Sequence, residues 1–369
     1  MSSQPHHFSD ADDTNHGSVL KTGRRIFSGF ESLSSEKCLE MYRLMVRTRA
    51  LEERTIKMSK SGEGYFWVGG PGEEAFNVAL GLQANIGKGP SFDYFHLHYR
   101  NAGTLLAMGM PMIDHIRQMA MTATDPHSRG RNFVGHYAVP AWNVVPVTSV
   151  IEVQYTMAPG TAKMQKRVPD GTGVSIVVGG DAGTAEGDFA SCMIWSSRPG
   201  DELPVLMVVT NNRYGISTPA STQHGEKRIC DRGEVFGIPG ELVDGNDPIL
   251  VWHALERAFE YCRKERRPFL LEVEVSRLHG HSSSSGASRI QHEPDCVRLF
   301  ERKLIDAGVI HQELAEAIYH EALEEASAAV EKVASEPRPT KDDLYSHTYA
   351  PSSVDQIYPT DFTGLPGEN

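Results

Sequence analysis

The residues of this sequence with the clearest capacity for chemistry are a carboxylate and an amide, each placed after an apolar run. Asp181 follows the run Thr172–Gly180, and Asn212 closes a pair of asparagines after the run Leu203–Thr210. If the runs are neighbouring parallel strands, their carboxyl ends meet at one edge of the sheet, where such folds bind ligands. Carboxylate and amide oxygens suit Mg²⁺, and the glycines before Asp181 let backbone N–H groups approach a phosphate. The pair therefore predicts a magnesium and phosphate site.

A second candidate is the histidine-bearing segment Ser276–Ser285, S-R-L-H-G-H-S-S-S-S. Imidazole titrates near neutral pH, so a histidine in this segment suits proton transfer. His281 is the candidate, with His279 as the weaker alternative. Taken alone, the segment is more typical of a flexible serine-rich linker. A catalytic role is favoured only because other motifs occur in the same sequence.

These side chains need a rigid frame, and the apolar runs supply one. The strand Thr172–Gly180, the helix 184–197 and the strand Leu203–Thr210 form a strand–helix–strand unit, which indicates a right-handed crossover in a parallel sheet. The sequence therefore predicts an α/β fold with a central parallel sheet and helices on both faces. The other predicted elements are strands 240–244 and 269–275, a helix over 35–60 capped by Ser34 or Ser35 and ended by Gly62, helices 73–86 and 251–265, and a C-terminal helical extension over 294–334 with a break near Gly308.

The chain divides into three parts by composition. Residues 1–33 are polar and predict an arm that is disordered or clasps another surface. Residues 34–345 predict one domain that includes the C-terminal helices, and residues 346–369 predict a polar tail. The stretch 122–147 is rich in Gly, Pro, His and Arg without hydrophobic periodicity, which indicates either a long functional loop or disorder.

Composition argues against several classes of partner and compartment. The formal charge of −12 argues against nucleic acid and anionic membrane surfaces as partners. No apolar run reaches the ~18 residues of a membrane span, and the polar first residues have no signal-peptide core. The five cysteines are scattered without a C-x-x-C pair, which indicates reduced thiols and a cytoplasmic protein.

Two other enzyme classes are weighed at this point. Gly70–Ala75 fits the G-x-G-x-x-A fingerprint of nicotinamide dinucleotide enzymes, and Asp93 follows it near the distance expected of a ribose-binding acid. A proline inside the turn, and two glutamates where the pyrophosphate would bind, argue against this class. A zinc hydrolase has only two H-x-H pairs in its favour and no H-E-x-x-H motif.

The run from Gly180 to Asn212 resembles the thiamine-diphosphate motif, a G-D-G opening followed further along by N-N, with Ala182 in place of the second glycine. Four more segments accompany it in matching order. Together they resemble the alpha subunit of the decarboxylating dehydrogenase component of 2-oxo acid dehydrogenase complexes, which has a thiamine-diphosphate-binding fold. The segments are G-E-E-A at 72–75, H-Y-R-N-A-G at 98–103, N-N-R-Y-G-I-S-T-P-A-S-T-Q at 211–223 and S-R-L-H-G-H-S-S-S-S at 276–285.

The resemblance implies a cofactor and its contacts. Thiamine diphosphate accepts the electrons of the carbanion that decarboxylation of a 2-oxo acid leaves. Mg²⁺ would join its diphosphate to Asp181, Asn212 and the backbone carbonyl of Tyr214, while Tyr99 and Arg100 would grip the diphosphate. A contact to the aminopyrimidine is implied for the Ser149 side chain and the Ile151 backbone. The implied cofactor-binding set is Tyr99, Arg100, Ser149, Ile151, Gly180, Asp181, Ala182, Gly183, Asn212, Arg277 and His281.

For the reaction, the resemblance implies oxidative decarboxylation of a 2-oxo acid with reductive acylation of a lipoyl domain. It makes His281 the catalytic residue, which handles the substrate oxygen and the incoming lipoyl group. The segment S-T-P-A-S-T-Q favours a branched-chain substrate over pyruvate. An acetoin-cleaving alpha subunit stays open, as does an inactive assembly subunit, because of Ala182 and because no aspartate follows the serines. Tyr65, Phe66 and Trp67 fit an acyl pocket and core packing equally well.

The resemblance also implies partners. A separate beta subunit would supply the residues around the pyrimidine half of the cofactor, in an α2β2 heterotetramer with the cofactor at the subunit interface. A lipoyl-bearing acyltransferase would accept the acyl group. Neither nucleic acid nor a membrane is an expected partner.

Overall fold

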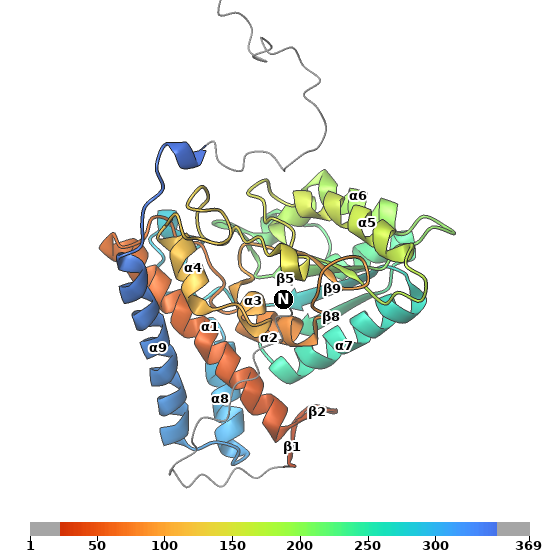
Figure 1. Cartoon of the computed structure of the whole chain (residues 1–369). Helices are drawn as coiled ribbons and strands as arrows, with labels where there is room; N and C mark the ends of the chain where they lie inside the picture. Colours follow the sequence, from red (N-terminus) through yellow and green to blue (C-terminus); the bar gives the residue numbers. More distant parts are fainter. Residues whose placement is uncertain (1–22, 345–369) are drawn as a thin grey trace, which may run out of the picture.

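The computed structural model describes residues 23–344, and its centre is a five-stranded parallel sheet (Figure 1). The strands are β3 (Tyr94–His96), β4 (Ser175–Gly180), β5 (Val205–Asn211), β8 (Gly240–Asp244) and β9 (Phe269–Glu274). Their order in the sheet is β3-β4-β5-β9-β8, and every pair is parallel. β4 and β5 are the two apolar runs that lead to the predicted site, and they lie side by side with Gly180 paired to Thr210. The predicted α/β fold is confirmed.

Helices cover both faces of the sheet because successive strand residues point to opposite sides. Val177 and Val209 pack in one apolar cluster with α5 (Val153–Lys166) and α6 (Gly187–Ser196). Their neighbours along the strands belong to the larger core cluster, which includes α7 (Pro248–Glu265). Figure 1 shows α5 and α6 on one side of the sheet and α7 on the other.

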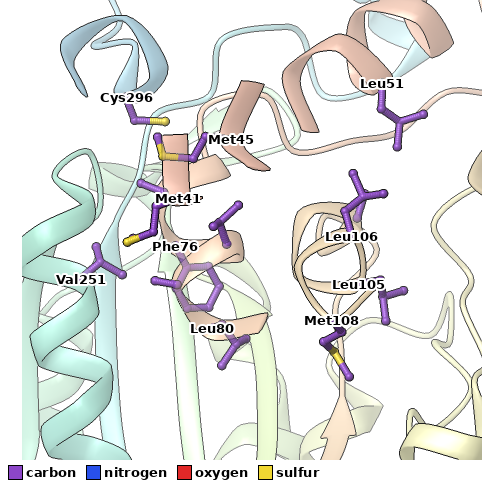
Figure 2. Close-up of a cluster of buried hydrophobic side chains, with 14 of the residues drawn as sticks. Met41, Met45, Leu51, Phe76, Leu80, Leu105, Leu106, Met108, Val251 and Cys296 are labelled. Atoms are coloured by element: carbon purple, nitrogen blue, oxygen red, sulfur yellow. The ribbon is translucent and has the colours of Figure 1, made fainter. Parts of the chain in front are cut away.

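A further helical layer flanks the sheet. Ser34 begins the longest helix, α1, by accepting a hydrogen bond from the Lys37 backbone N–H at 3.2 Å, and Gly62, with a φ of 79°, ends it. Figure 2 shows Met41 and Met45 from this helix in the core, close to Phe76 and Val251. The helices of this layer are α1 (Ser35–Ser61), α2 (Glu74–Gln83), α3 (Ala102–Ala107), α4 (Met112–Met119), α8 (Cys296–Asp306) and α9 (Gln312–Ala334).

Several predicted boundaries were wrong. The helix expected from residue 184 begins at Gly187, because a 3₁₀ turn over Ala182–Ala185 comes first. The helix expected over 73–86 ends at Gln83, and α7 begins three residues before the predicted Val251 because Asp247 caps it. The sequence reading had also missed β3, α3, α4 and α5 altogether.

The last eleven residues of the predicted N-terminal arm, 23–33, belong to the part of the chain that the structure describes. Arg25–Ser28 and Glu31–Ser34 form the antiparallel hairpin β1-β2, which buries Ile26 and Leu33 against the core. The rest of the predicted arm, residues 1–22, and the predicted tail over 346–369 lie outside the described residues. Among the described residues, none of the helices is both long and apolar enough to cross a membrane.

Candidate active site

Asp181 lies directly after β4 and is buried, with 1% of its surface exposed. Its backbone N–H donates to the Thr210 carbonyl on β5 at 3.3 Å. Burial raises the pKa of the carboxyl, while the backbone N–H groups of Ala182 and Asn212 oppose that rise. The outer oxygen, Oδ2, is buried and has no hydrogen-bond partner among the described residues. Asp181 and Asn212 therefore lie together at the sheet edge, and within residues 23–344 one carboxylate oxygen of Asp181 has no hydrogen-bond partner.

The turn after β5 carries the other two predicted metal ligands. The Asn212 side-chain oxygen accepts the Tyr214 backbone N–H at 3.1 Å, which closes the turn. The Arg277 guanidinium lies over the Tyr214 ring at 4.9 Å and donates to the Ile216 carbonyl at 2.7 Å. These contacts join the turn to the histidine-bearing segment that begins one strand away.

Arg100 and His281 are in direct contact. One terminal nitrogen of Arg100 lies 3.2 Å from His281 Nδ1 and 3.3 Å from the His281 carbonyl, and the other donates to the Gly69 carbonyl. Because a guanidinium only donates, Nδ1 accepts and the proton of neutral His281 is on Nε2. Burial, then the charges of Arg100 and Arg277, lower the pKa of His281 to about 4. His281 is therefore a neutral hydrogen-bond donor at physiological pH.

The predicted diphosphate residues share this region. The Tyr99 ring stands edge-on to the His281 ring at 6.3 Å, and the Arg100 guanidinium lies 5.1 Å from the Tyr99 ring centre. Burial lowers the pKa of Arg277, Arg100 lowers it further, and Tyr214, Asp181 and Tyr99 act in the opposite direction. The structure thus brings Tyr99, Arg100, Asp181, Tyr214, Arg277 and His281 into one neighbourhood.

Serines hold the histidine loop in place, although no aspartate follows them. Ser282 is 1% exposed and caps a 3₁₀ turn over Ser283–Ser285 in a reciprocal capping box. Ser283 and Trp67 exchange two hydrogen bonds, at 2.8 and 2.7 Å, that tie the loop to the core. Trp67 is fully buried, so of its two predicted roles core packing applies.

The segment predicted to meet the aminopyrimidine lies beside the same sheet edge. Ser149 shares a short hydrogen bond with Nε2 of His136, a residue that the sequence reading missed. Ile151 is 52% exposed. Glu152 follows it with a φ of 62° and is 3% exposed.

Glu152 is a second residue that the sequence reading missed. One of its oxygens accepts the Gly180 backbone N–H at 3.1 Å. Its carboxyl fills the space under the turn, since a Cβ at Gly179 or Gly183 would come within 2.0 or 1.8 Å of it. Burial raises the pKa of Glu152 to about 8. A single acid between β-branched residues, V-I-E-V, was the only signal in the sequence.

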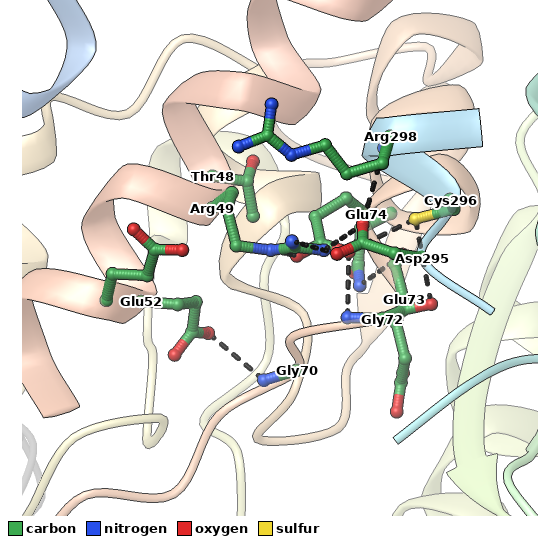
Figure 3. A network of polar contacts seen from close by, with 12 residues as sticks. Thr48, Arg49, Glu52, Gly70, Gly72, Glu73, Glu74, Asp295, Cys296 and Arg298 are labelled. Carbon is green, nitrogen blue, oxygen red and sulfur yellow. Dashed lines mark hydrogen bonds and ion pairs between the residues drawn. The ribbon is translucent and has the colours of Figure 1, made fainter. Parts of the chain in front are cut away.

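Three buried carboxyls surround the turn that joins residue 69 to α2 (Figure 3). Glu52 accepts the Gly70 N–H at 3.1 Å, and Glu74 pairs with the Arg49 Nε at 2.6 Å. Glu73 lies 3.9 Å from the Arg100 Nε, and its second oxygen has no partner among the described residues. Burial raises the pKa of Glu73 to about 8 against the opposing charge of Arg100. The turn that fits a dinucleotide fingerprint is therefore filled by acids of the chain itself.

Asp93, the candidate ribose-binding acid of the dinucleotide fingerprint, is paired with another side chain of the chain. Asp93 is fully buried and accepts two hydrogen bonds from Arg263, at 2.7 and 2.8 Å. It also accepts the Asn85 and Val174 backbone N–H groups at 2.9 Å. Its contacts are those of a structural ion pair between the residue before β3 and α7.

Comparison with known families agrees with this geometry. The family described as dehydrogenase E1 component matches residues 42–342, which include every predicted site residue. The chain belongs to the dehydrogenase E1 component family. Membership confirms the resemblance seen in the sequence and implies thiamine diphosphate as the cofactor of the family.

Curated relatives of this E1 chain include alpha subunits from bacteria and animals. The 2-oxoisovalerate dehydrogenase subunit alpha of Bacillus subtilis is 28% identical over 86% of this chain and 97% of its own. The pyruvate dehydrogenase E1 component subunit alpha of Bacillus cereus is 28% identical over 86% and 83%. The mitochondrial 2-oxoisovalerate dehydrogenase subunit alpha of Homo sapiens is 27% identical over 86% and 71%. The prediction of a 2-oxo acid dehydrogenase alpha subunit is confirmed.

Proposed function

We propose that this chain is the alpha subunit of a 2-oxo acid dehydrogenase that prefers branched-chain substrates and holds thiamine diphosphate through Mg²⁺. The observation that carries the proposal is the buried Asp181 at the carboxyl edge of β4 and β5, with Arg277 over the ring of Tyr214 in the next turn and Arg100 hydrogen-bonded to His281. The 2-oxoisovalerate relative from Bacillus subtilis, matched over 86% of this chain and 97% of its own, supports the branched-chain preference, while the pyruvate relative from Bacillus cereus has the same 28% identity over 86% and 83%.

The residues present fit the proposed groups. The unpartnered buried oxygen of Asp181 suits a hard cation, which the Asn212 oxygen and the Tyr214 carbonyl would complete. A Cβ at Gly180 would meet nothing within 4 Å, so this position leaves open space above the turn that carries Ala182 and Gly183.

The arginines would supply the opposing charge for a diphosphate. Arg100 is 4% exposed, and Arg277 has a buried Nε without a partner among the described residues. Because the pKa of Glu73 is raised to about 8, its carboxyl is mostly protonated at neutral pH and leaves the charge of Arg100 for an anion. Tyr99 would fix the Arg100 plane by its ring contact.

When bound, thiamine diphosphate supplies the electron sink for decarboxylation of the 2-oxo acid. The residues of the chain would contribute proton transfer and hydrogen bonding to the reaction. With Nδ1 held by Arg100, His281 has its Nε2–H to donate to a developing oxygen charge or to a lipoyl sulfur. Ser149 and the Ile151 backbone would meet the aminopyrimidine, with His136 orienting the Ser149 hydroxyl.

We further propose the assembly and location that the sequence predicts. A beta subunit would complete the cofactor site in an α2β2 heterotetramer, and a lipoyl-bearing acyltransferase would accept the acyl group. The exposed side chains of Val150, Ile151, Ile194 and Trp195 lie on the segment and helix beside the site and suit a protein contact. All five cysteines are buried free thiols, which suits the reducing cytoplasm.

The first test is the composition of the particle purified from its own cells with Mg²⁺ present. Mass spectrometry after denaturation should find thiamine diphosphate and a second chain in equal amount. A homo-oligomer without a second chain contradicts the assembly. A partner chain without cofactor, and without binding of added cofactor, favours the inactive assembly subunit.

Two variants test the residue roles. Arg100→Ala should raise the thiamine diphosphate concentration needed for half activity, and Arg302→Ala, an exposed position on α8, is the matched control. His281→Ala should slow acyl transfer to the lipoyl domain while cofactor still binds, which calorimetry of cofactor binding can establish. Unchanged acyl transfer would remove His281 from the reaction. Comparing kcat/KM for 2-oxoisovalerate and pyruvate tests the substrate preference.

A further inference from the structure

A long apolar groove lies between α1 and α9, away from the sheet edge that carries the site. Its volume is about 850 Å³, within the range of ligand and peptide pockets. Its floor is apolar and comes from five separate parts of the chain. The apolar residues that line it are Leu39, Leu44, Leu82, Leu106, Ala107, Met110, Val309, Ile318 and Ala322.

The rims of the groove carry charges of both signs. Arg47 on α1 donates two hydrogen bonds to Glu325 on α9, at 2.8 and 2.6 Å. Arg43 lies 3.7 Å from Glu321 and keeps 46% of its side chain exposed. An apolar floor between polar rims is typical of a groove that binds another chain segment, a partner or a ligand.

The described chain begins at one end of this groove. The Gly23 backbone N–H donates to a carboxylate oxygen of Glu36 at 2.7 Å, and Glu36 lines the groove. The Ser35 N–H donates to the Arg24 carbonyl at 2.7 Å, and the Arg24 side chain donates to the Ala307 carbonyl. The first described residues are therefore fixed to the end of α8 and the start of α1, where the groove opens.

We propose that residues 1–22 of the same chain occupy this groove, with Val19 and Leu20 on its apolar floor. Leu20 is three residues from Gly23, so it reaches about 10 Å along the floor at ~3.3 Å per extended residue. The groove wall from Glu36 to Arg47 spans eleven residues of helix, or about 16 Å. The arm is long enough to cover the whole floor.

The composition of the arm fits this occupant. Its apolar residues include Phe8 besides Val19 and Leu20, and the acids Asp10, Asp12 and Asp13 lie between them in sequence. The lining of the groove carries four glutamates against two arginines, Arg43 and Arg47, so the apolar residues of the arm and not its acids supply the fit. The proposal does not depend on the cofactor, because the groove shares no residue with the site.

The test compares the full chain, in its native assembly, with Val19→Asp/Leu20→Asp. Ser18→Asp/Thr22→Asp is the matched control, since it adds the same charge beside the apolar pair. We expect the fluorescence of an environment-sensitive apolar dye to rise about threefold in the first variant, with faster amide exchange over 36–47 and 318–325. The control should match the wild type in both readouts.

A cross-link provides a positive readout. Leu20→Cys with Arg43→Cys should form a disulfide under mild oxidation, because the five native cysteines are buried and do not compete. Leu20→Cys with Glu256→Cys, an exposed position on α7, should not. Equal dye binding in all forms together with no cross-link overturns the proposal. A groove protected only at high protein concentration assigns it to a second copy, and a bound apolar small molecule in native mass spectrometry assigns it to a ligand; both results also overturn it.

Discussion

The replacement Glu73→Gln tests whether the acid next to Arg100 carries a proton in the folded chain. Glu73 is 2% exposed, with one oxygen 3.9 Å from the Arg100 Nε and the other without a partner among the described residues. Burial raises its pKa from 4.5 to about 8. Glutamine keeps the shape and removes the titration.

The sign of the effect follows from proton linkage. The folded chain holds the Glu73 proton up to about pH 8, whereas the unfolded chain releases it near pH 4.5. The stabilisation from this group is therefore complete below the unfolded value and is lost as the pH rises through the folded value. At about 1.4 kcal/mol per pH unit, Glu73 costs the wild type about 2 kcal/mol of unfolding free energy between pH 6 and pH 8. In Glu73→Gln this pH-dependent loss of unfolding free energy is absent, because glutamine does not titrate.

The assay is urea unfolding of both chains at pH 6, 7 and 8 with a chelator present. We expect the unfolding free energy of Glu73→Gln, relative to wild type, to rise by about 2 kcal/mol across this range. Glu324→Gln, an exposed position on α9, should show a constant difference. If the difference for Glu73→Gln is also constant, Glu73 does not hold a proton near neutrality and the argument for Arg100 as a free cation is lost.

Substitutions at three further positions test other buried polar groups by thermal or urea unfolding. Glu152→Ala should lower the unfolding free energy by about 2 kcal/mol, because it leaves a backbone N–H unpaired, while Glu152→Gln should lose less than about 1 kcal/mol; equal losses would contradict the hydrogen-bond account. Arg263→Met should cost about 3 kcal/mol, since Asp93 keeps only backbone donors, and a neutral result would mean that the pair adds nothing. Trp67→Phe should lower the unfolding free energy by about 1–3 kcal/mol, because Glu52 loses the 2.8 Å hydrogen bond from the indole N–H. If the same loss is absent when Trp67→Phe is combined with Glu52→Gln, the loss comes from this hydrogen bond.

Apolar runs made the centre of the fold predictable. β8 was placed to the residue, and β4 and β5 to within a few residues, because a strand buried on both faces has a continuous apolar sequence. α5 could not be found in this way, because Pro159 lies inside it and glycine follows. The helix forms because Tyr155 and its apolar neighbours pack on the sheet, which outweighs the local propensity.

The residues of the candidate site also fall into those that the sequence could predict and those that it could not. The closeness of Asp181 and Asn212 could be predicted from the sequence, because each residue follows the end of a strand. The strand–helix–strand unit predicted that these two strands are parallel neighbours. His136 and Glu152 could not, since their contacts join segments that no local pattern relates to the sheet edge. The burial of Glu73 could not be predicted for a related reason: no local pattern marks a charged residue as buried, and only the tertiary fold encloses it.

The carboxyl under the glycine turn constrains how this lineage can change. Positions 152, 155, 179 and 183 form one epistatic set, because a Cβ at Gly183 would meet the Glu152 side chain and a Cβ at Gly179 would meet both Glu152 and the Tyr155 ring. Gly180 is outside the set, since no atom lies within 4 Å of its missing Cβ. A change at Gly183 therefore requires Glu152 to shift or shrink, whereas a change at Gly179 requires room at Tyr155 as well, so the four positions are expected to vary together among homologues.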